Sequence, residues 1–180
     1  MNIPNLITIA RILLVPIIIW LLLSEEFSLA FFLFVLAAAT DAADGALARA
    51  THTQSEVGAY LDPLADKLLL VSTFATLGIT KQIPTWLVIT VISRDILIIG
   101  GLMLSWFMNK PVKVKPLWVS KVTTVLQLFF VGLVLAQLGY AIAPRTLIDS
   151  SAFLVAGLTL ASGLAYMKQW IAHMSETTSA

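Results

Sequence analysis

Six long apolar stretches, separated by short polar segments, run through this chain. They cover about residues 6–23, 28–49, 58–79, 85–107, 118–138 and 150–170. Each meets or approaches the ~20 apolar residues that a helix needs to cross the hydrocarbon core of a bilayer. The stretches are continuous and lack the two-residue alternation of a membrane β-barrel. The pattern therefore predicts an all-α, polytopic membrane protein with six transmembrane helices.

The charged residues between these stretches predict the orientation of the helices. With the amino terminus in the cytoplasm, most of the lysines and arginines near the helix ends and in the connecting segments fall on the cytoplasmic side, as the positive-inside rule requires. They are Arg11, Arg49, Lys110, Lys113, Lys115 and Lys168. The opposite side holds Lys81 and Arg145, together with the acidic Glu25 and Glu26. Both termini are expected in the cytoplasm, and the expected location is a bacterial inner membrane.

The composition supports one membrane domain. Of the 180 residues, 59% are hydrophobic and 12% are charged, whereas soluble domains carry about a quarter charged residues. The absence of cysteine excludes disulfides and thiolate metal sites, and the net charge of +1 gives no sign of a nucleic-acid partner. The first apolar run ends at Ser24 with no small-residue cleavage pattern, so we expect a retained helix rather than a signal peptide. Residues 1–180 are expected to form a single integral membrane domain.

Four aspartates interrupt the second and third apolar stretches: Asp41, Asp44, Asp62 and Asp66. A carboxylate at mid-depth in a bilayer costs roughly 2.5–3.5 kcal/mol or more, so a group of four must line a wet cavity or surround cations. The spacings of three and four residues put each pair on one face of a helix. Two such helices can converge on divalent cations, and magnesium, manganese and calcium prefer oxygen ligands of this kind. We therefore expect two divalent ions at the cytoplasmic ends of these helices.

The residues around the aspartates suggest a ligand beside the ions. Gly45 and Gly58 allow either close packing of helices or close approach of a ligand to the backbone. Arg49 can meet a phosphate in a forked geometry, although a positive-inside anchor is the simpler interpretation. Three residues of the first helix are expected at the rim of the pocket: Asn5, Thr8 and Arg11.

Two other classes of function remain open on the aspartates alone. The first is a divalent-cation transporter in which the four aspartates line the ion path. The second is a membrane scaffold that keeps the fold but has no catalytic activity. A path needs polar residues across the whole depth of the membrane, whereas these acids crowd one end. The complete set of four argues against a scaffold.

The pattern resembles the signature of the CDP-alcohol phosphotransferase family. It reads Asp41-Ala-Ala-Asp44-Gly45-Ala-Leu-Ala48-Arg49, eight residues, Gly58, three residues, Asp62, three residues, Asp66. Eight specified positions at fixed spacing make this a specific motif. The opening segment, with Asn5, Thr8 and Arg11, is also similar to the start of phospholipid-synthesising members. The expected six helices agree with the family's fold.

The resemblance implies transfer of a substituted phosphate from a CDP-linked lipid to an alcohol, with release of CMP. It implies two Mg²⁺ or Mn²⁺ ions held by Asp41, Asp44 and Asp62, with Asp66 as the remaining ligand and the general base. It further implies a homodimer. The residues expected to border CDP are Asn5, Thr8, Gly45, Ala48, Arg49 and Gly58.

The expected acceptor is an alcohol that carries phosphate. Arg94, Lys115 and Lys121 belong to a cationic group that suits such an acceptor through charge-assisted contacts, although lysines here also suit anionic lipid head groups. Arg94 and Lys121 lie within or at the edge of apolar runs, so we expect them to point inward to a ligand. Asp95 beside Arg94 suits a local ion pair. The segments around Ser93-Arg94-Asp95 and Val114–Gln127 are similar to CMP-forming cardiolipin synthases, whose acceptor is phosphatidylglycerol. The alternative branch, the phosphatidylglycerophosphate synthases, uses glycerol 3-phosphate. That branch usually shows Arg-Glu followed by Gly-Leu-Arg, from which Arg94-Asp95 and Gly101-Leu102-Met103 depart.

Overall fold

The structure is a computed structural model that describes the backbone of residues 3–51, 56–107 and 118–176. Side chains are described for residues 9–41, 67–101, 103 and 118–171. All regular elements in these ranges are helices, and none of the described residues forms a strand. The helices are α1 (Ile3–Leu23), α2 (Phe27–Thr51), α3 (Glu56–Ile79), α4 (Thr85–Phe107), α5 (Trp118–Tyr140) and α6 (Arg145–Glu176). The predicted all-α class is confirmed.

The last helix is longer than the apolar pattern predicts. The sequence analysis expects it at 150–170, whereas α6 begins at Arg145 and continues to Glu176. Its first turn follows Pro144, whose carbonyl oxygen accepts a hydrogen bond from the N–H of Leu147 at 3.0 Å. Proline is well suited to a helix start because it has no N–H to leave unpaired. Hydropathy marks the apolar part of a helix, whereas its hydrogen-bonded ends extend further.

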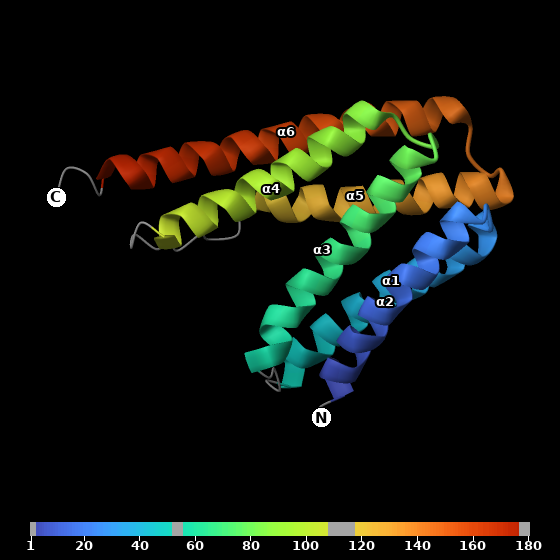
Figure 1. Ribbon diagram of the computed structural model, residues 1–180, viewed down its shortest axis with the longest axis horizontal. Coiled ribbons are helices and arrows are strands. Elements are labelled where there is room, and N and C mark those ends of the chain that lie inside the picture. The colour runs from blue at the N-terminus through green and yellow to red at the C-terminus, as the bar shows by residue number, and fades with distance from the viewer. Residues whose placement is uncertain (1–2, 52–55, 108–117, 177–180) are drawn as a thin grey trace.

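Three tight turns connect the helices at one end of the molecule. Glu25, Lys81 and Ala141 have positive φ values of 61°, 58° and 54°. After α1 and α3 the chain closes with a Schellman-type bond, from Glu26 N–H to the Leu21 carbonyl and from Gln82 N–H to the Leu77 carbonyl, both 2.9 Å. Figure 1 shows these turns on the right, away from both termini. The two termini therefore lie on the side opposite the turns.

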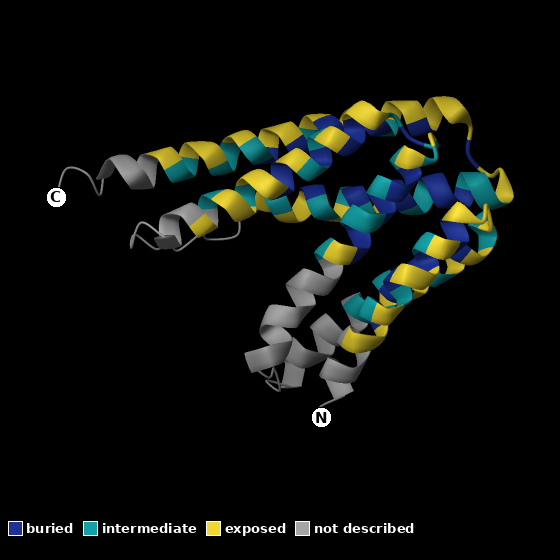
Figure 2. Ribbon diagram, in the orientation of Figure 1, coloured by how far each residue is buried: buried dark blue, intermediate teal, exposed yellow. Residues whose placement is uncertain are grey.

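The helices form two groups, α1 with α2 and α4 with α6, and α3 packs against α1 of the first group and α4 of the second. In Figure 1, α1 and α2 run together, α4 and α6 run together along the top, and the upper end of α3 leads into the turn before α4. α1 packs against both α2 and α3, and α5 packs against α2 and α6. The rings of Phe74 on α3 and Phe130 on α5 stack with their centroids 6.0 Å apart. Figure 2 shows the buried residues gathered where the helices converge.

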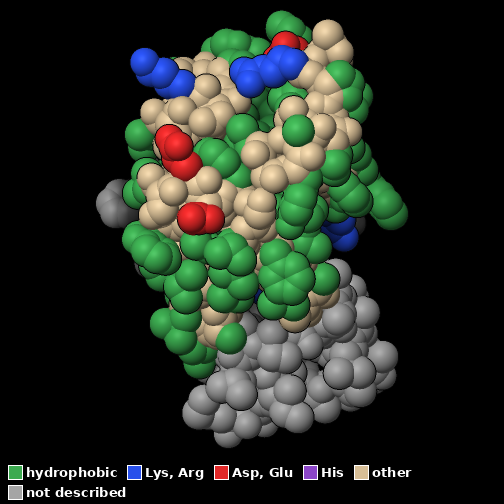
Figure 3. Space-filling view, turned by 90° about the vertical axis from the view of Figure 1, so that its right-hand side faces the viewer, with side chains coloured by type: hydrophobic (Ala, Val, Ile, Leu, Met, Phe, Trp, Pro, Cys, Tyr) green, Lys and Arg blue, Asp and Glu red, His purple; other side chains and the backbone are tan. Residues whose placement is uncertain are grey.

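The outward faces of the helices are apolar. Leu13, Phe32, Phe129 and Leu164 are each more than half exposed. Figure 3, which faces the end of the molecule where the turns lie, shows hydrophobic side chains together with a few acidic and basic groups. Within the described residues, two helices are long and apolar enough to cross a membrane, at Trp118–Tyr140 and Arg145–Ile171. An apolar outer surface of this kind suits contact with lipid rather than water.

Candidate active site

Asp41 on α2 forms an ion pair with Arg11 on α1. The Arg11 Nη2 atom lies 2.6 Å from the Asp41 Oδ1 atom. The arginine side chain is 2% exposed and that of the aspartate is 34% exposed. A buried guanidinium needs a charged partner because its desolvation is costly. The sequence analysis expected Arg11 at the rim of the pocket. In the structure Arg11 is buried between helices, where it pairs with Asp41 and lines the same small cavity.

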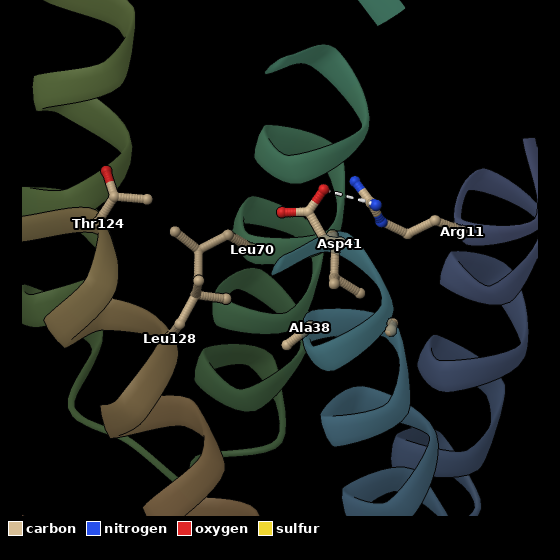
Figure 4. A pocket seen from close by; sticks show the side chains of 8 residues that line it. Arg11, Ala38, Asp41, Leu70, Thr124 and Leu128 are labelled. Atoms are coloured by element: carbon tan, nitrogen blue, oxygen red, sulfur yellow. Dashed lines mark ion pairs between the residues drawn. The ribbon is translucent and has the colours of Figure 1, made fainter. Parts of the chain in front are cut away.

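A small cavity lies beside this ion pair. Its volume is about 40 Å³, which is room for a few water molecules. Figure 4 shows that one oxygen of Asp41 faces Arg11 while the other points toward the side of Leu70 and Leu128. The remaining lining residues come from α2, α3 and α5: Ala37, Ala38, Leu69 and Thr124. The Asp41 carboxylate therefore has one oxygen fixed by Arg11 and a second directed into the cavity.

The other signature residues lie on the two helices that the sequence predicts. Asp44, Gly45, Ala48 and Arg49 belong to the backbone of α2, which ends at Thr51. Gly58, Asp62 and Asp66 belong to α3, which begins at Glu56. The helical spacing of both aspartate pairs is thus confirmed on the backbone. The side chains of these residues, and those of Asn5 and Thr8, lie outside the described residues.

The chemistry of the donor set fits a divalent cation. An Asp41 oxygen directed into a cavity is a hard ligand of the type that Mg²⁺ and Mn²⁺ prefer. Among the side chains that the structure describes, no group of three histidines, cysteines or acids lies together. Asp41 is the only predicted ligand whose side chain is described. Asp44, Asp62 and Asp66 are placed only by their backbone positions on α2 and α3.

A second charged group, which we term the Asp95 cluster, links four helices. It consists of Lys67 on α3, Arg94 and Asp95 on α4, Ser120 on α5 and Ser162 on α6. The Asp95 Oδ1 atom accepts hydrogen bonds from Lys67 Nζ at 2.5 Å and from Arg94 Nη1 at 2.7 Å. The Arg94 Nη2 atom donates to the hydroxyls of Ser120 at 2.5 Å and Ser162 at 2.7 Å.

Two of the three predicted acceptor residues are described, and they lie in different environments. Arg94 is buried, as the sequence analysis expected, with its guanidinium 5.9 Å from the ring centroid of Tyr166. Lys121 was expected to point inward, but it is exposed, and its ammonium lies 6.0 Å from the ring centroid of Trp118. Lys115 lies outside the described residues.

The sequence analysis missed Lys67 and the partners that join it to the cluster. It considered Asp95 only as an ion-pair partner of Arg94, and this pair is confirmed. Lys67 stands directly after Asp66 at the start of an apolar run, and this position could have marked it as a charge that is paired within the protein. A charge in that place needs a partner, but the sequence gives no means of choosing Asp95, which is 28 positions further along.

Comparison with known protein families identifies the family of this chain. The profile of the CDP-alcohol phosphatidyltransferase family matches residues 1–172, nearly the whole chain. The chain belongs to this family. The match spans all the signature positions, so the resemblance seen in the aspartate pattern is confirmed over residues 1–172 rather than for the motif alone.

Curated members of the family resemble this chain over most of its length. A rice protein named CDP-diacylglycerol–glycerol-3-phosphate 3-phosphatidyltransferase 1, chloroplastic, is 36% identical over 92% of this chain and 56% of its own length. The rat cardiolipin synthase (CMP-forming) is 36% identical over 75% of this chain and 50% of its own. A probable cardiolipin synthase (CMP-forming) from Drosophila melanogaster is 32% identical over 93% of this chain and 57% of its own. The chain spans about half the length of these relatives.

Proposed function

We propose that this protein moves a phosphatidyl group from CDP-diacylglycerol to a phosphate-bearing glycerol acceptor and releases CMP. The observation that carries the proposal is the complete eight-position signature, set on two neighbouring helices within a chain that matches the family over residues 1–172. We favour the cardiolipin synthase reaction, with phosphatidylglycerol as acceptor. The alternative is the phosphatidylglycerophosphate synthase reaction with glycerol 3-phosphate, and relatives of both names match this chain.

The donor side of the proposed site is built around the four aspartates. Asp41, Asp44, Asp62 and Asp66 would hold two Mg²⁺ or Mn²⁺ ions, which would neutralise charge on the pyrophosphate and on the departing CMP. The fixed Asp41 oxygen at Arg11 leaves the other oxygen for this role. Six residues would border the CDP moiety: Asn5, Thr8, Gly45, Ala48, Arg49 and Gly58. Of these, Arg49 suits a phosphate through its forked donors.

The transfer step requires a base next to the acceptor hydroxyl. In the proposed reaction the hydroxyl oxygen forms a bond to the phosphorus of the phosphatidyl group, and the bond from that phosphorus to the CMP oxygen breaks. The Asp66 carboxylate takes the hydroxyl proton, which is the usual part of a positioned general base. Arg94, Lys121 and Lys115 are the proposed acceptor contacts. Because both terminal nitrogens of Arg94 already donate within the Asp95 cluster, its direct contact with an acceptor requires exchange of one of these hydrogen bonds.

The proposal also includes the arrangement in the membrane. Residues 1–180 would form one domain with six spanning helices, both termini and the active site on the cytoplasmic side, in a bacterial inner membrane and as a homodimer. The three turns at the end opposite the termini support an even number of crossings. Exposed Glu25 and Glu26 lie in the first of these turns, which agrees with a non-cytoplasmic position under the positive-inside rule.

An acceptor panel tests the proposal. The purified protein in lipid micelles receives CDP-diacylglycerol, Mg²⁺ or Mn²⁺, and either phosphatidylglycerol, glycerol 3-phosphate or unphosphorylated glycerol, and CMP release is measured. CMP release with phosphatidylglycerol supports the favoured reaction, and release with glycerol 3-phosphate alone supports the alternative. No CMP with any acceptor, together with flux of divalent cations in liposomes, contradicts the proposal and supports a transporter.

A further inference from the structure

The charged residues at the end of the molecule that carries the three turns are segregated by sign. The acidic Glu25 and Glu26 lie in the turn between α1 and α2. The basic Lys81 lies in the turn between α3 and α4, and Arg145 is the first residue of α6. Figure 3 faces this end and shows basic groups along its upper edge, where Figure 1 places α4 and α6, and two acidic groups well below them. The side of this end formed by α4 and α6, which we term the basic side, therefore differs in charge from the side formed by α1 and α2.

The basic side keeps a net positive charge among the described residues. Arg145 has one acidic neighbour, Asp149, whose Oδ1 atom lies 3.9 Å from the Arg145 Nε atom. These side chains are 65% and 56% exposed, and an ion pair so long and so exposed is weak. Lys81 is exposed and takes part in no ion pair among the residues that the structure describes. Two bases and one acid thus leave one positive charge on this side.

A pair of exposed aromatic rings lies next to the basic residues. Trp86 on α4 and Phe153 on α6 stack with their ring centroids 5.2 Å apart and their planes at 27°, although the residues are 41% and 69% exposed. Phe153 follows Arg145 by eight positions, which is about 12 Å along a helix, and Trp86 closely follows Lys81. Aromatic side chains at this depth suit the interface between lipid head groups and acyl chains. The basic residues then lie at the depth of the head groups.

We propose that Lys81, Arg145 and the Trp86–Phe153 pair form a docking surface for an anionic phospholipid of the non-cytoplasmic leaflet. The lipid phosphate accepts charge-assisted hydrogen bonds from the two basic side chains. The glycerol and the first acyl carbons of the lipid lie against the two rings. A zwitterionic lipid suits the surface less, because its ammonium group meets the same positive charge.

This surface lies far from the proposed catalytic groups. Asp66 stands thirteen residues before the end of α3 at Ile79, so about 20 Å of helix separates it from the turn that contains Lys81. A lipid on this surface is therefore distinct from the lipid that reacts. The inference rests on the membrane arrangement included in the proposed function, but not on its chemistry.

Quenching of Trp86 fluorescence by brominated lipids tests which lipid contacts the aromatic pair. A variant in which Trp86 is the remaining tryptophan is placed in phosphatidylcholine vesicles that contain equal fractions of either brominated phosphatidylglycerol or brominated phosphatidylcholine. The other four tryptophans are replaced by phenylalanine: Trp20, Trp106, Trp118 and Trp170. The same quenching is also measured as the difference between the parent protein and Trp86→Phe, so that the result does not depend on the folding of the fourfold variant. One net cation near a lipid phosphate corresponds to about a fivefold preference for phosphatidylglycerol.

Matched variants connect this preference to the basic side. Lys81 has a φ of 58°, a conformation that asparagine tolerates well, so Lys81→Asn removes the cation and keeps the turn. We expect Lys81→Asn to reduce the preference to within about twofold, whereas Lys81→Arg should keep it. The control Glu26→Gln changes a charge in the turn between α1 and α2 and should match the parent protein. High salt should also weaken the preference, because both partners are exposed.

CMP release by the same preparations separates this inference from the proposed reaction. Selective quenching that Lys81→Asn removes supports the inference, whether or not CMP forms. Equal quenching by the two brominated lipids overturns it, as does a preference that is unchanged in Lys81→Asn, and CMP release then leaves the proposed function standing. A preference that changes as much in Glu26→Gln as in Lys81→Asn also overturns it, because that result indicates a general effect of protein charge.

Discussion

Gln127 on α5 offers a test of the packing between α5 and α6. Its side chain is fully buried, and its Nε2 atom donates to the hydroxyl of Thr159 on α6 at 3.0 Å. Its Oε1 atom is buried and accepts no hydrogen bond from the residues that the structure describes. The Thr159 hydroxyl itself donates to the Val155 carbonyl oxygen at 2.7 Å. Removal of the glutamine amide therefore leaves the threonine proton bonded.

Gln127→Met is expected to stabilise the protein slightly. Methionine has nearly the same length and volume and fills the same space. The substitution loses an interhelical hydrogen bond worth ~0.6 kcal/mol on average in membrane helices. It also removes a buried unpaired oxygen whose desolvation costs about 1–3 kcal/mol. The difference predicts a gain in the free energy of unfolding of about 0.5–2 kcal/mol.

The matched variant Thr159→Val should have the opposite effect. It leaves the Gln127 Nε2 atom without its Thr159 partner, beside an Oε1 atom that already lacks one among the described residues, and this should cost about 1–3 kcal/mol. The double variant should resemble Gln127→Met, because the valine then faces an apolar neighbour. The assay is unfolding by titrated SDS in mixed micelles, with CMP release as a second measurement that should stay at the parental level in Gln127→Met. A loss of more than 1 kcal/mol in Gln127→Met would refute the reasoning and indicate a polar partner at Oε1.

Three further predictions concern the two charged groups and the helix contacts. Asp66→Asn should abolish CMP release while leaving the unfolding free energy close to the parental value, and substantial turnover by this variant would exclude Asp66 as the base. Asp95→Leu should destabilise the protein by about 3–5 kcal/mol, because it removes the carboxylate that pairs with the buried Arg94 guanidinium; a loss below about 1 kcal/mol in the SDS titration would contradict this charge argument. Gly139→Ala should cost about 1–3 kcal/mol, since its Cβ would lie 3.0 Å from the backbone N and Cα of Ser28, and an unchanged SDS midpoint would show that α2 and α5 can separate at this point.

The apolar pattern predicted the helices well because hydrophobic length is a local property. The expected stretch 85–107 coincides with α4, and the expected start at residue 118 coincides with that of α5. The extended start of α6 at Arg145 was missed because it depends on Pro144 and on the turn's hydrogen bonds rather than on hydropathy. Secondary structure in this chain thus follows from short-range sequence, except where a helix end is set by its first turn.

The partners of the buried charges were much harder to predict. The pairs Arg11–Asp41 and Lys67–Asp95 join residues about thirty positions apart, on different helices. A charge in an apolar run predicts that a partner exists, but the identity of the partner depends on which helix faces lie together. The pattern of the four aspartates was informative for the opposite reason, because each of its two pairs lies within one helix and its spacing is visible in the sequence.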